Sequence, residues 1–458
     1  MHTCRTWRRI VFEPQQALHL RLFCTHGSPV LKSLDFWPAL PIVVQYGGSL
    51  ELDPPTPEDE VYIMAAIKHS DRVISISLTL TSLLQAKLST IKSPFSALED
   101  LVLVSQNRME YPFQPRLVLW WGARLRRLHL TRIAILELPR LLHSSKNLVD
   151  LQLHEVLYPL DFPAETLTNA FSGMTQLRSF SLHFTPYSYS NRFAEFLPSR
   201  KLVALPSLTR FDFQGNASVV KAFVAGVDAP LLGDINVTFL DHSVTDISDQ
   251  SDQSDTFDLS DQSDQSDPFD LSVLIDFINR IKIHKSPRRA DILSSEDDIT
   301  ISLTQPGVHT RIRWEFYGAP PSTMARICIQ FSAFLFNVED LRIYGKQPLP
   351  WNDGPYNERW LPETVHLFIG VKWLQVSGNL SCDFVNFLQR RHWRRESVLP
   401  ALHKIHVLQP GPCHASMREA IESLLASRRL SGHHIAVEYE NILHFNNEIR
   451  ATGTAHSH

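Results

Sequence analysis

A short hydrophobic phrase, Leu-x-x-Leu-x-Leu, recurs along this chain. Clean copies begin at Leu98, Leu125 and Leu148, and looser copies with Phe, Ile or Val in place of Leu begin at residues 73, 177, 208, 232, 338, 371 and 402. In an extended strand, alternate side chains face opposite sides, so the fourth and sixth positions of the phrase share one apolar face. One such strand cannot bury that face alone, whereas stacked neighbours can. The pattern therefore predicts a parallel sheet with connectors on its outer side.

The spacing of the phrase predicts the class of fold. The clean copies start 27 and 23 residues apart, and leucine-rich repeats run roughly 20–29 residues. Residues 138–143 and 166–171 place apolar side chains at helical spacing between copies. We expect an α/β leucine-rich-repeat solenoid, a curved parallel sheet lined by helices and loops. A generic α/β protein with leucine-rich strands is the alternative.

Other segments predict individual elements from their periodicity and their turn residues. The expected elements are a strand at 18–22, a Pro-rich acidic loop at 35–60, a helix from about Pro57 to Lys68, a helix at 272–283, two neighbouring strands at 299–304 and 310–316 that could form a hairpin, a helix at 417–429 and a last strand at 434–439.

An acidic insert interrupts the repeats. Residues 248–259 are followed at once by a second block, 260–271, that differs only at Thr256 and Pro268. Aspartate recurs at every third position, so an ordered helix would bring like charges together. We expect a disordered Ser/Asp/Gln insert at 241–271. A calcium site is the alternative, but the glycine and terminal glutamate of a calcium loop are missing. The predicted organisation is a solenoid at 23–240 and 272–440, with a disordered tail at 441–458.

Composition and charge bear on the cellular location of the protein and on its classes of partner. The net charge is −4, with five scattered cysteines and no Cys-x-x-Cys pair. No signal peptide or long apolar run is visible, so we expect a cytoplasmic or nuclear protein that has no membrane or nucleic-acid partner. Residues 390–395 form a short basic run around a tryptophan, for which a solvated surface is favoured over nucleic-acid contact.

Catalytic motifs are not visible. The chain has no P-loop, Gly-x-Gly-x-x-Gly, Gly-x-Ser-x-Gly or His-Glu-x-x-His motif. We therefore expect no enzyme activity and no cofactor, and an enzyme with a site in a connector is the weaker alternative. His129, His154, His183 and His406 fall at or just after repeat strands. They could together bind a metal, although a hydrogen-bonding role is favoured and no metal is expected.

The outward strand positions predict a binding surface. In a solenoid these positions line the concave face, where partners bind. Trp373 is the best single anchor, because buried aromatic side chains dominate interface energies. The predicted partner-binding residues are Asp100, Arg127, His129, Asp150, Gln152, Arg210, Asp212, Asp340, Arg342, Trp373, Gln375, Lys404 and His406.

The N-terminal segment adds a resemblance. Residues 4–12, Cys-Arg-Thr-Trp-Arg-Arg-Ile-Val-Phe, followed by 18–22, resemble the closing stretch of an F-box. Together with the repeats and with residues 34–42, 286–296 and 331–341, the chain resembles the fungal (basidiomycete-type) F-box and leucine-rich-repeat proteins. Residues 1–22 would then be a remnant of the last F-box helix and the first strand. Members of the family carry a Leu-Pro-rich first half of the F-box upstream of this stretch, and that half is missing from the sequence before Cys4.

The resemblance implies a function. Such proteins are substrate receptors of Skp–cullin–F-box ubiquitin ligases. Trp7 and Ile10 would contribute to the adaptor-binding side, and a Skp-type adaptor is expected only where the F-box is intact. The substrate would be a protein bound on the concave repeat face. The alternative is a stand-alone leucine-rich-repeat scaffold or binding module that has no link to ubiquitin.

Overall fold

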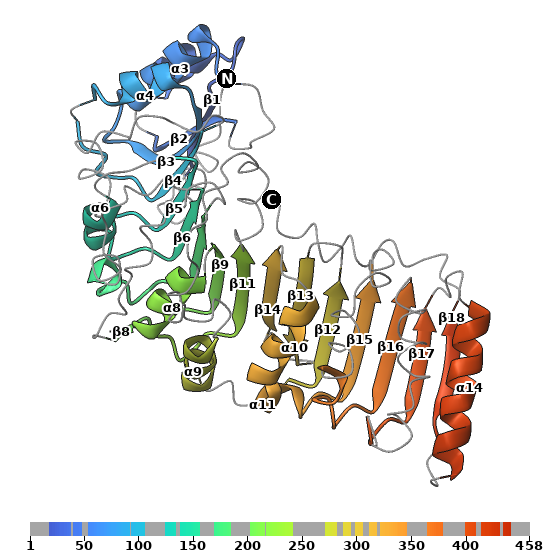
Figure 1. The fold of residues 1–458 in the computed structure, drawn as a ribbon. Helices are drawn as coiled ribbons and strands as arrows, with labels where there is room; N and C mark the ends of the chain where they lie inside the picture. The colour runs from blue at the N-terminus through green and yellow to red at the C-terminus, as the bar shows by residue number, and fades with distance from the viewer. Residues whose placement is uncertain are drawn as a thin grey trace, which may run out of the picture. The chain divides into compact units, whose positions relative to one another are not determined.

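The protein is a mixed α/β molecule with a long, mostly parallel 16-stranded sheet (Figure 1). In the computed structural model, the residues described are 18–37, 40–47, 54–91, 93–105, 124–133, 138–155, 169–184, 202–215, 217–240, 271–281, 287–294, 298–305, 311–317, 321–345, 364–378, 399–408, 414–430 and 434–440. The chain divides into two compact units, residues 1–232 and 233–458. The predicted domain boundaries are a finer division and stay predictions.

Unit 1 is built on parallel strands that follow the order of the sequence. Each strand pairs with the next one along the sheet, and β7 pairs directly with β9. The strands are β1 (Leu20–Phe23), β2 (Ile42–Tyr46), β3 (Val73–Leu80), β4 (Asp100–Ser105), β5 (Arg127–Thr131), β6 (Asp150–His154), β7 (Ser179–His183) and β9 (Arg210–Gly215). The short strands β8 (Val203–Ala204) and β10 (Val227–Asp228) form a separate parallel pair.

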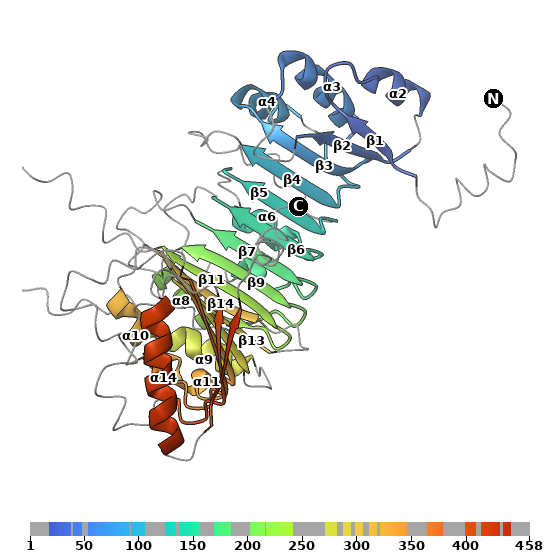
Figure 2. The ribbon, with the colours of Figure 1, turned by 90° about the vertical axis from the view of Figure 1, so that its right-hand side faces the viewer.

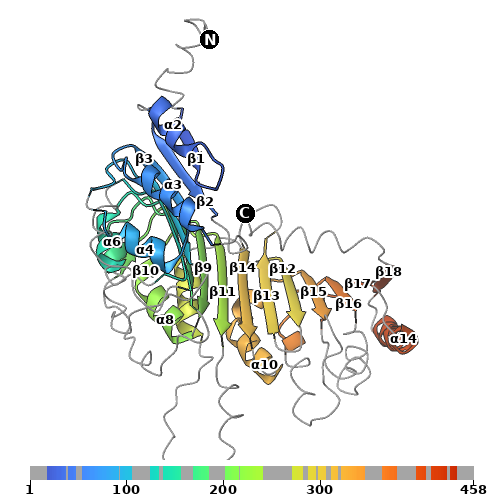
Figure 3. The ribbon, with the colours of Figure 1, turned by 90° about the horizontal axis from the view of Figure 1, so that it is seen from above.

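The helices of unit 1 are α2 (Val30–Phe36), α3 (Pro57–Ile67), α4 (Ser82–Leu88), α6 (Leu138–Ser144) and α8 (Ala217–Ala225). Figures 1 and 3 show α4, α6 and α8 along one side of the strands. The helix predicted to start at Pro57 is confirmed. Its first turn is fixed by a capping box, in which the Thr56 hydroxyl accepts a hydrogen bond from the Asp59 N–H, and the Thr56 N–H donates to the Asp59 carboxylate.

The recurring phrase forms the core, as its alternation predicts. Every side chain in the three leucine positions of the ten copies is at most 5% exposed. The copies align in register across the strands, so that Leu101 pairs with Leu128 and Leu128 with Leu151. Where phenylalanine replaces leucine in the phrase, it occupies the same position in the register, so Phe180 pairs with Phe211. Each strand thus continues the apolar layer of the strand before it.

Unit 2 has a mixed strand order. It is β11-β14-β13-β12-β15-β16-β17-β18, with β13 antiparallel to both of its neighbours and all other pairs parallel. The strands are β11 (Asp234–Leu240), β12 (Arg289–Ser294), β13 (Asp298–Thr304), β14 (Arg311–Tyr317), β15 (Asp340–Gly345), β16 (Trp373–Gly378), β17 (Lys404–Leu408) and β18 (Ala436–Glu440). The hairpin predicted at 299–316 is confirmed as β13 and β14.

The helices of unit 2 are α9 (Ser272–Arg280), α10 (Pro321–Gln330), α11 (Ser332–Leu335) and α14 (His414–Leu430). They lie on one side of the unit 2 strands in Figure 2. The helices predicted near 272 and 417 and the strand predicted at 434–439 are therefore present, with slightly shifted ends. No helix in the described ranges is long and apolar enough to cross a membrane.

One prediction from the sequence was wrong. Residues 35–60 were expected to form a loop, but β2 lies within them and pairs on both sides, with β1 and with β3. The prolines that favour a loop lie outside β2, whose own residues, Ile-Val-Val-Gln-Tyr, have strong strand propensity. The basic run (390–395), the C-terminal tail (441–458) and the predicted insert (241–271) lie outside the described residues, except for Leu271, which is buried at the start of α9.

Candidate interaction surface on the sheet

The predicted partner-binding residues of unit 1 occupy alternate strand positions between the buried leucines. Residues 100, 127, 150 and 210 form one row across the strands, and residues 129, 152 and 212 form the next row. Arg127 and Arg210 are exposed, whereas the others are half-buried. These side chains therefore lie beside one another on the face of the sheet opposite to the core layer.

Arg127 and Asp100 form a bidentate ion pair. The Nε and Nη2 atoms of Arg127 each donate to a different carboxylate oxygen of Asp100, both at 2.6 Å. This hydrogen bond, with Asp150 and Glu99 also nearby, raises the pKa of Arg127. The Arg127 side chain is 63% exposed, so solvent screens the pair and limits its contribution to stability. The pair holds the guanidinium in one orientation on the sheet surface.

Three histidines from consecutive strands form a stack that we call the histidine ladder: His129 on β5, His154 on β6 and His183 on β7. The rings of His154 and His183 are stacked at 4.1 Å, and His129 meets His154 edge-on at 5.2 Å. Burial, reinforced by the two neighbouring imidazoles, lowers the pKa of His154 to about 3. Burial also lowers the pKa of His129. The ladder is therefore largely uncharged at its centre at neutral pH.

Ser181 and Asp212 complete this cluster. The His183 Nε2 lies 2.8 Å from an Asp212 carboxylate oxygen and 3.2 Å from the Ser181 hydroxyl. That hydroxyl also donates to the same carboxylate oxygen at 3.1 Å. A nucleophile relay needs the hydroxyl and the carboxylate on different imidazole nitrogens, whereas here they share one. The Ser181 hydroxyl also lies 2.9 Å from the Nε2 atom of His154, so Ser181 joins both stacked imidazoles to Asp212 in one hydrogen-bond network. Among the described residues, no three His, Cys, Asp or Glu side chains are grouped so that they could hold a metal.

The corresponding surface of unit 2 centres on Trp373. Its side chain is 58% exposed at the start of β16. The Lys404 ammonium lies 5.5 Å from the centre of the Trp373 ring and also forms a 2.7 Å ion pair with Glu438 on β18. The lysine is thus held over one part of the indole. Trp373 and Lys404 are direct neighbours in the strand register.

An arginine–carboxylate network lies on the neighbouring strands. Arg289 Nε contacts Asp340 at 2.8 Å, and Arg342 Nη2 contacts the same carboxylate oxygen at 3.5 Å. Asp291 lies opposite Arg342 in the register and is half-buried, and partial burial raises its pKa even though Arg342 and Arg289 oppose the shift. The network balances its charges internally, so it offers few free charges to a ligand.

Two further predicted residues lie beside Trp373 and Lys404. Gln375 donates a hydrogen bond to the Tyr344 hydroxyl at 3.2 Å. His406 pairs in register with Gln375 on one side and Glu438 on the other. The predicted adaptor-binding residues, Trp7 and Ile10, lie outside the described residues.

Sequence reasoning missed several surface residues. The strand β12 was not predicted, so Arg289 and Asp291 were overlooked, although the alternation Arg-Ala-Asp-Ile is visible in the sequence. Tyr344 was missed because the repeat phrase ends one residue before it. His154 and His183 were grouped with His129 and His406 as residues that could together bind a metal, but their stacking was not predicted. Their stacking depends on the strand register, which the sequence alone does not display.

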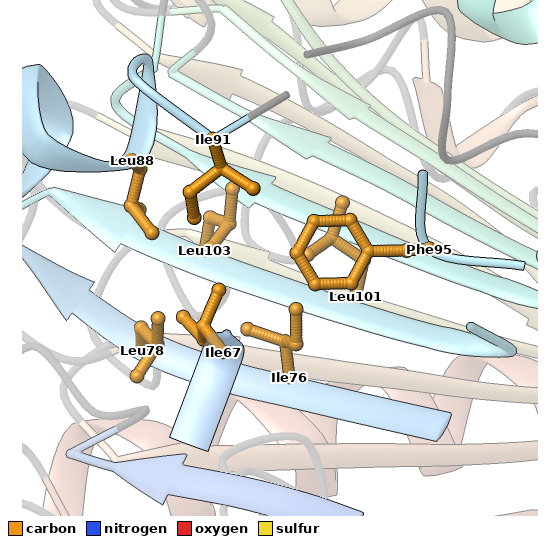
Figure 4. Close-up of a pocket in the computed structure, with 8 residues that line it drawn as sticks. All are labelled: Ile67, Ile76, Leu78, Leu88, Ile91, Phe95, Leu101 and Leu103. Atoms are coloured by element: carbon orange, nitrogen blue, oxygen red, sulfur yellow. The ribbon is translucent and has the colours of Figure 1, made fainter. Parts of the chain in front are cut away.

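A small pocket in unit 1 offers no comparable chemistry. Figure 4 shows its lining side chains, all of them hydrocarbon, gathered from α3, β3, α4, β4 and the segment between α4 and β4. They are Ile67, Ile76, Leu78, Leu88, Ile91, Phe95, Leu101 and Leu103. The pocket is a packing gap between the helices and the core face of the sheet.

Comparison with known proteins does not place the chain in a family. No protein-family model matches it. No curated protein matches it either.

Proposed function

We propose that this protein is a non-enzymatic recognition subunit that binds a substrate protein on the solvent-facing side of its repeat strands. The proposal includes a leucine-rich-repeat solenoid as the finer description of the sheet, with that side as its concave face. The sequence resemblance suggests the further role of substrate receptor in a Skp–cullin–F-box ubiquitin ligase.

The observation that carries the proposal is the exposure of Trp373. A tryptophan that is 58% exposed on a sheet surface leaves a large apolar area in water. Lys404 is restrained beside it by Glu438, so part of the surrounding polar surface is already ordered before a partner arrives. Ordered aromatic anchors with polar surroundings are typical of the centres of protein interfaces.

The surface around Trp373 favours a protein partner over a small ligand. The neighbouring groups Gln375, Tyr344 and His406 combine donors, acceptors and aromatic area across adjacent strands. An open, mixed surface of this kind suits a polar protein segment with electrostatic selectivity. The ubiquitin link rests separately on Trp7 and Ile10, which by resemblance would lie on the adaptor side.

The test replaces Trp373 by alanine in the full chain. Interacting proteins would be captured from host lysate with the wild-type and variant chains and compared quantitatively by mass spectrometry. The control is Trp37→Ala, which removes another partly exposed tryptophan (41%) in unit 1. We expect a defined protein to be retained by the wild type and the control and lost from Trp373→Ala. Equal capture by all three chains would overturn the proposal.

The ubiquitin link and its alternative are separated in the same experiment. Recovery of a Skp-type adaptor and a cullin with the chain, or with a form extended by a complete F-box, supports the ligase role. If neither form recovers them while the Trp373-dependent partner persists, the protein is a stand-alone binding module.

A further inference from the structure

The two end strands of the sheet each have one neighbour among the described residues. β1 pairs only with β2, and β18 pairs only with β17. The N–H groups of Leu20 and Cys24 donate to backbone carbonyls on the β2 side, at 2.7 and 2.9 Å. Because backbone groups alternate in direction along a strand, those of Arg21 and Phe23 point to the outer edge of β1. Such an edge can pair with a further strand.

At the other end, the apolar layer is less well covered. The Ala436 N–H donates to the His403 carbonyl at 2.9 Å, so the backbone groups of Val437 and Tyr439 point to the outer edge of β18. Tyr439 is aligned with Val407 on the core side, yet Tyr439 is 42% exposed and Val407 only 1%. The outer edge of β18 therefore combines strand backbone with exposed apolar area.

The two end strands carry opposite charges on the face opposite to the core. Arg21 is exposed, and no described residue pairs with its side chain. Glu438 is 57% exposed and contacts Lys404 through its Oε2 atom, so its other carboxylate oxygen can accept a hydrogen bond from a second cation. An arginine at one end of the sheet thus matches a glutamate at the other.

The backbone pattern allows these two charges to meet. Each end strand already runs parallel to its inner neighbour, so a parallel pair of β18 with β1 from another molecule would continue the pattern at both ends. With Glu438 of one molecule opposite Arg21 of the next, the Arg21 backbone groups reach the outer-edge groups of Val437 and Tyr439, as in a parallel ladder. The same alignment places Tyr439 beside Leu22 on the core side.

We propose that the outer edge of β18 binds the outer edge of β1 in a second copy of this chain, so that molecules join end to end. Pairing of two β18 strands is disfavoured, because it brings two copies of Glu438 close together. A contact between two different surfaces leaves one of each free in a dimer, so further copies can add. Self-association of this kind goes beyond the proposed recognition of a substrate.

The test measures the mass of the full chain by sedimentation velocity over a range of concentrations. We expect the wild type to form dimers and larger species as its concentration rises. Arg21→Glu and Glu438→Lys should each weaken association by about tenfold or more, because each places like charges at the contact. The controls, Arg178→Glu and Glu99→Lys, make the same charge changes at exposed positions just before the inner strands β7 and β4. They should associate like the wild type.

An equimolar mixture of the two edge variants decides the outcome. Arg21→Glu carries an acid at both edges and Glu438→Lys a base at both, so mixing restores opposite charges at every contact and should recover association. A wild type that stays monomeric, a mass that stops at the dimer, or no recovery on mixing would overturn the proposal. So would an Arg21→Glu chain that associates like the wild type. If circular dichroism shows a variant to be unfolded, Arg21→Gln or Glu438→Gln replaces it, with a smaller loss expected.

Discussion

The imidazole rings of His154 and His183 are stacked 4.1 Å apart, with their planes inclined by only 6°. They occupy paired positions on the parallel strands β6 and β7. Because parallel strands in register repeat the same side-chain direction at each step, two histidines at equivalent repeat positions are brought face to face. The stack is thus a direct product of the repeat.

The histidine ladder should make folding sensitive to acid. The pKa of His154 falls from its usual value near 6.5 to about 3, so the unfolded chain binds this proton more readily than the folded chain does. The stabilising contribution is full above about pH 6.5 and is lost as pH falls from there toward 3. The groups facing His154 are His129, His183 and Asp212.

Replacing His154 by glutamine tests this linkage. We expect the wild type to lose on the order of 2 kcal/mol more unfolding free energy than His154→Gln between pH 6.5 and 4.5. The free energies would come from denaturant titrations at both pH values. His143→Gln, on the exposed side of α6, should keep the wild-type difference. An identical pH dependence in all three chains would show that His154 is not the linked group.

Core truncations should be costly where the repeat phrase is buried. Leu128 and Leu151 are at most 1% exposed, so Leu128→Ala and Leu151→Ala remove packed methyl groups and leave cavities. We expect each to lower the free energy of unfolding by about 2–5 kcal/mol. Leu83→Ala, at an exposed position of α4 (53%), should cost far less. Similar losses at all three positions in equilibrium denaturation would contradict the register.

The pair formed by Arg127 and Asp100 should couple weakly. Its bidentate geometry favours a measurable interaction, but the exposure of Arg127 screens it. A double-mutant cycle with Asp100→Ala and Arg127→Ala should give a coupling energy of about 0.2–1 kcal/mol. We expect the coupling to fall in 1 M salt. A larger, salt-independent value would mean that water is excluded from the pair.

Gly370 should not tolerate a larger side chain. A Cβ atom at this position would lie 2.6 Å from the Phe336 carbonyl oxygen and 3.2 Å from that of Val338. Moving these backbone atoms aside would distort the chain, so Gly370→Ala should lower the free energy of unfolding by about 1–3 kcal/mol and lower the midpoint of thermal unfolding. At Gly173, a Cβ would meet only the Lys146 side chain at 3.7 Å, and Gly173→Ala should be close to neutral. Equal midpoints for the two variants would rule out the clash.

The repeat strands could be predicted in detail because their signal is local. The three leucine positions of each phrase indicate that the segment is a strand and which of its faces is buried against the neighbouring repeats. The burial of Leu101, Leu128 and Leu151 follows from that pattern. Strands outside the phrase were harder to predict. The loop prediction at 35–60 gave weight to nearby prolines and missed β2, whose partners on β1 and β3 are distant in the sequence.

The candidate surface was predicted as a set of positions, but its interactions were not. Arg127 and Arg210 occupy the same row of the sheet, yet Arg127 is held by Asp100, and no described side chain holds Arg210. The difference depends on which residue occupies the adjacent strand and on the rotamer it adopts. The exposure of Trp373 and the position of Lys404 beside it likewise depend on neighbours across strands.

The sequence by itself determined which side chains are buried in the repeat strands and that neighbouring repeats pair in parallel, because a period-two pattern specifies a buried face within a few residues. Only the tertiary structure decided the antiparallel placement of β13 between β14 and β12 and the stacking of His154 on His183. These features join residues that are far apart in the chain. Register and packing between strands set them, and no local pattern encodes either.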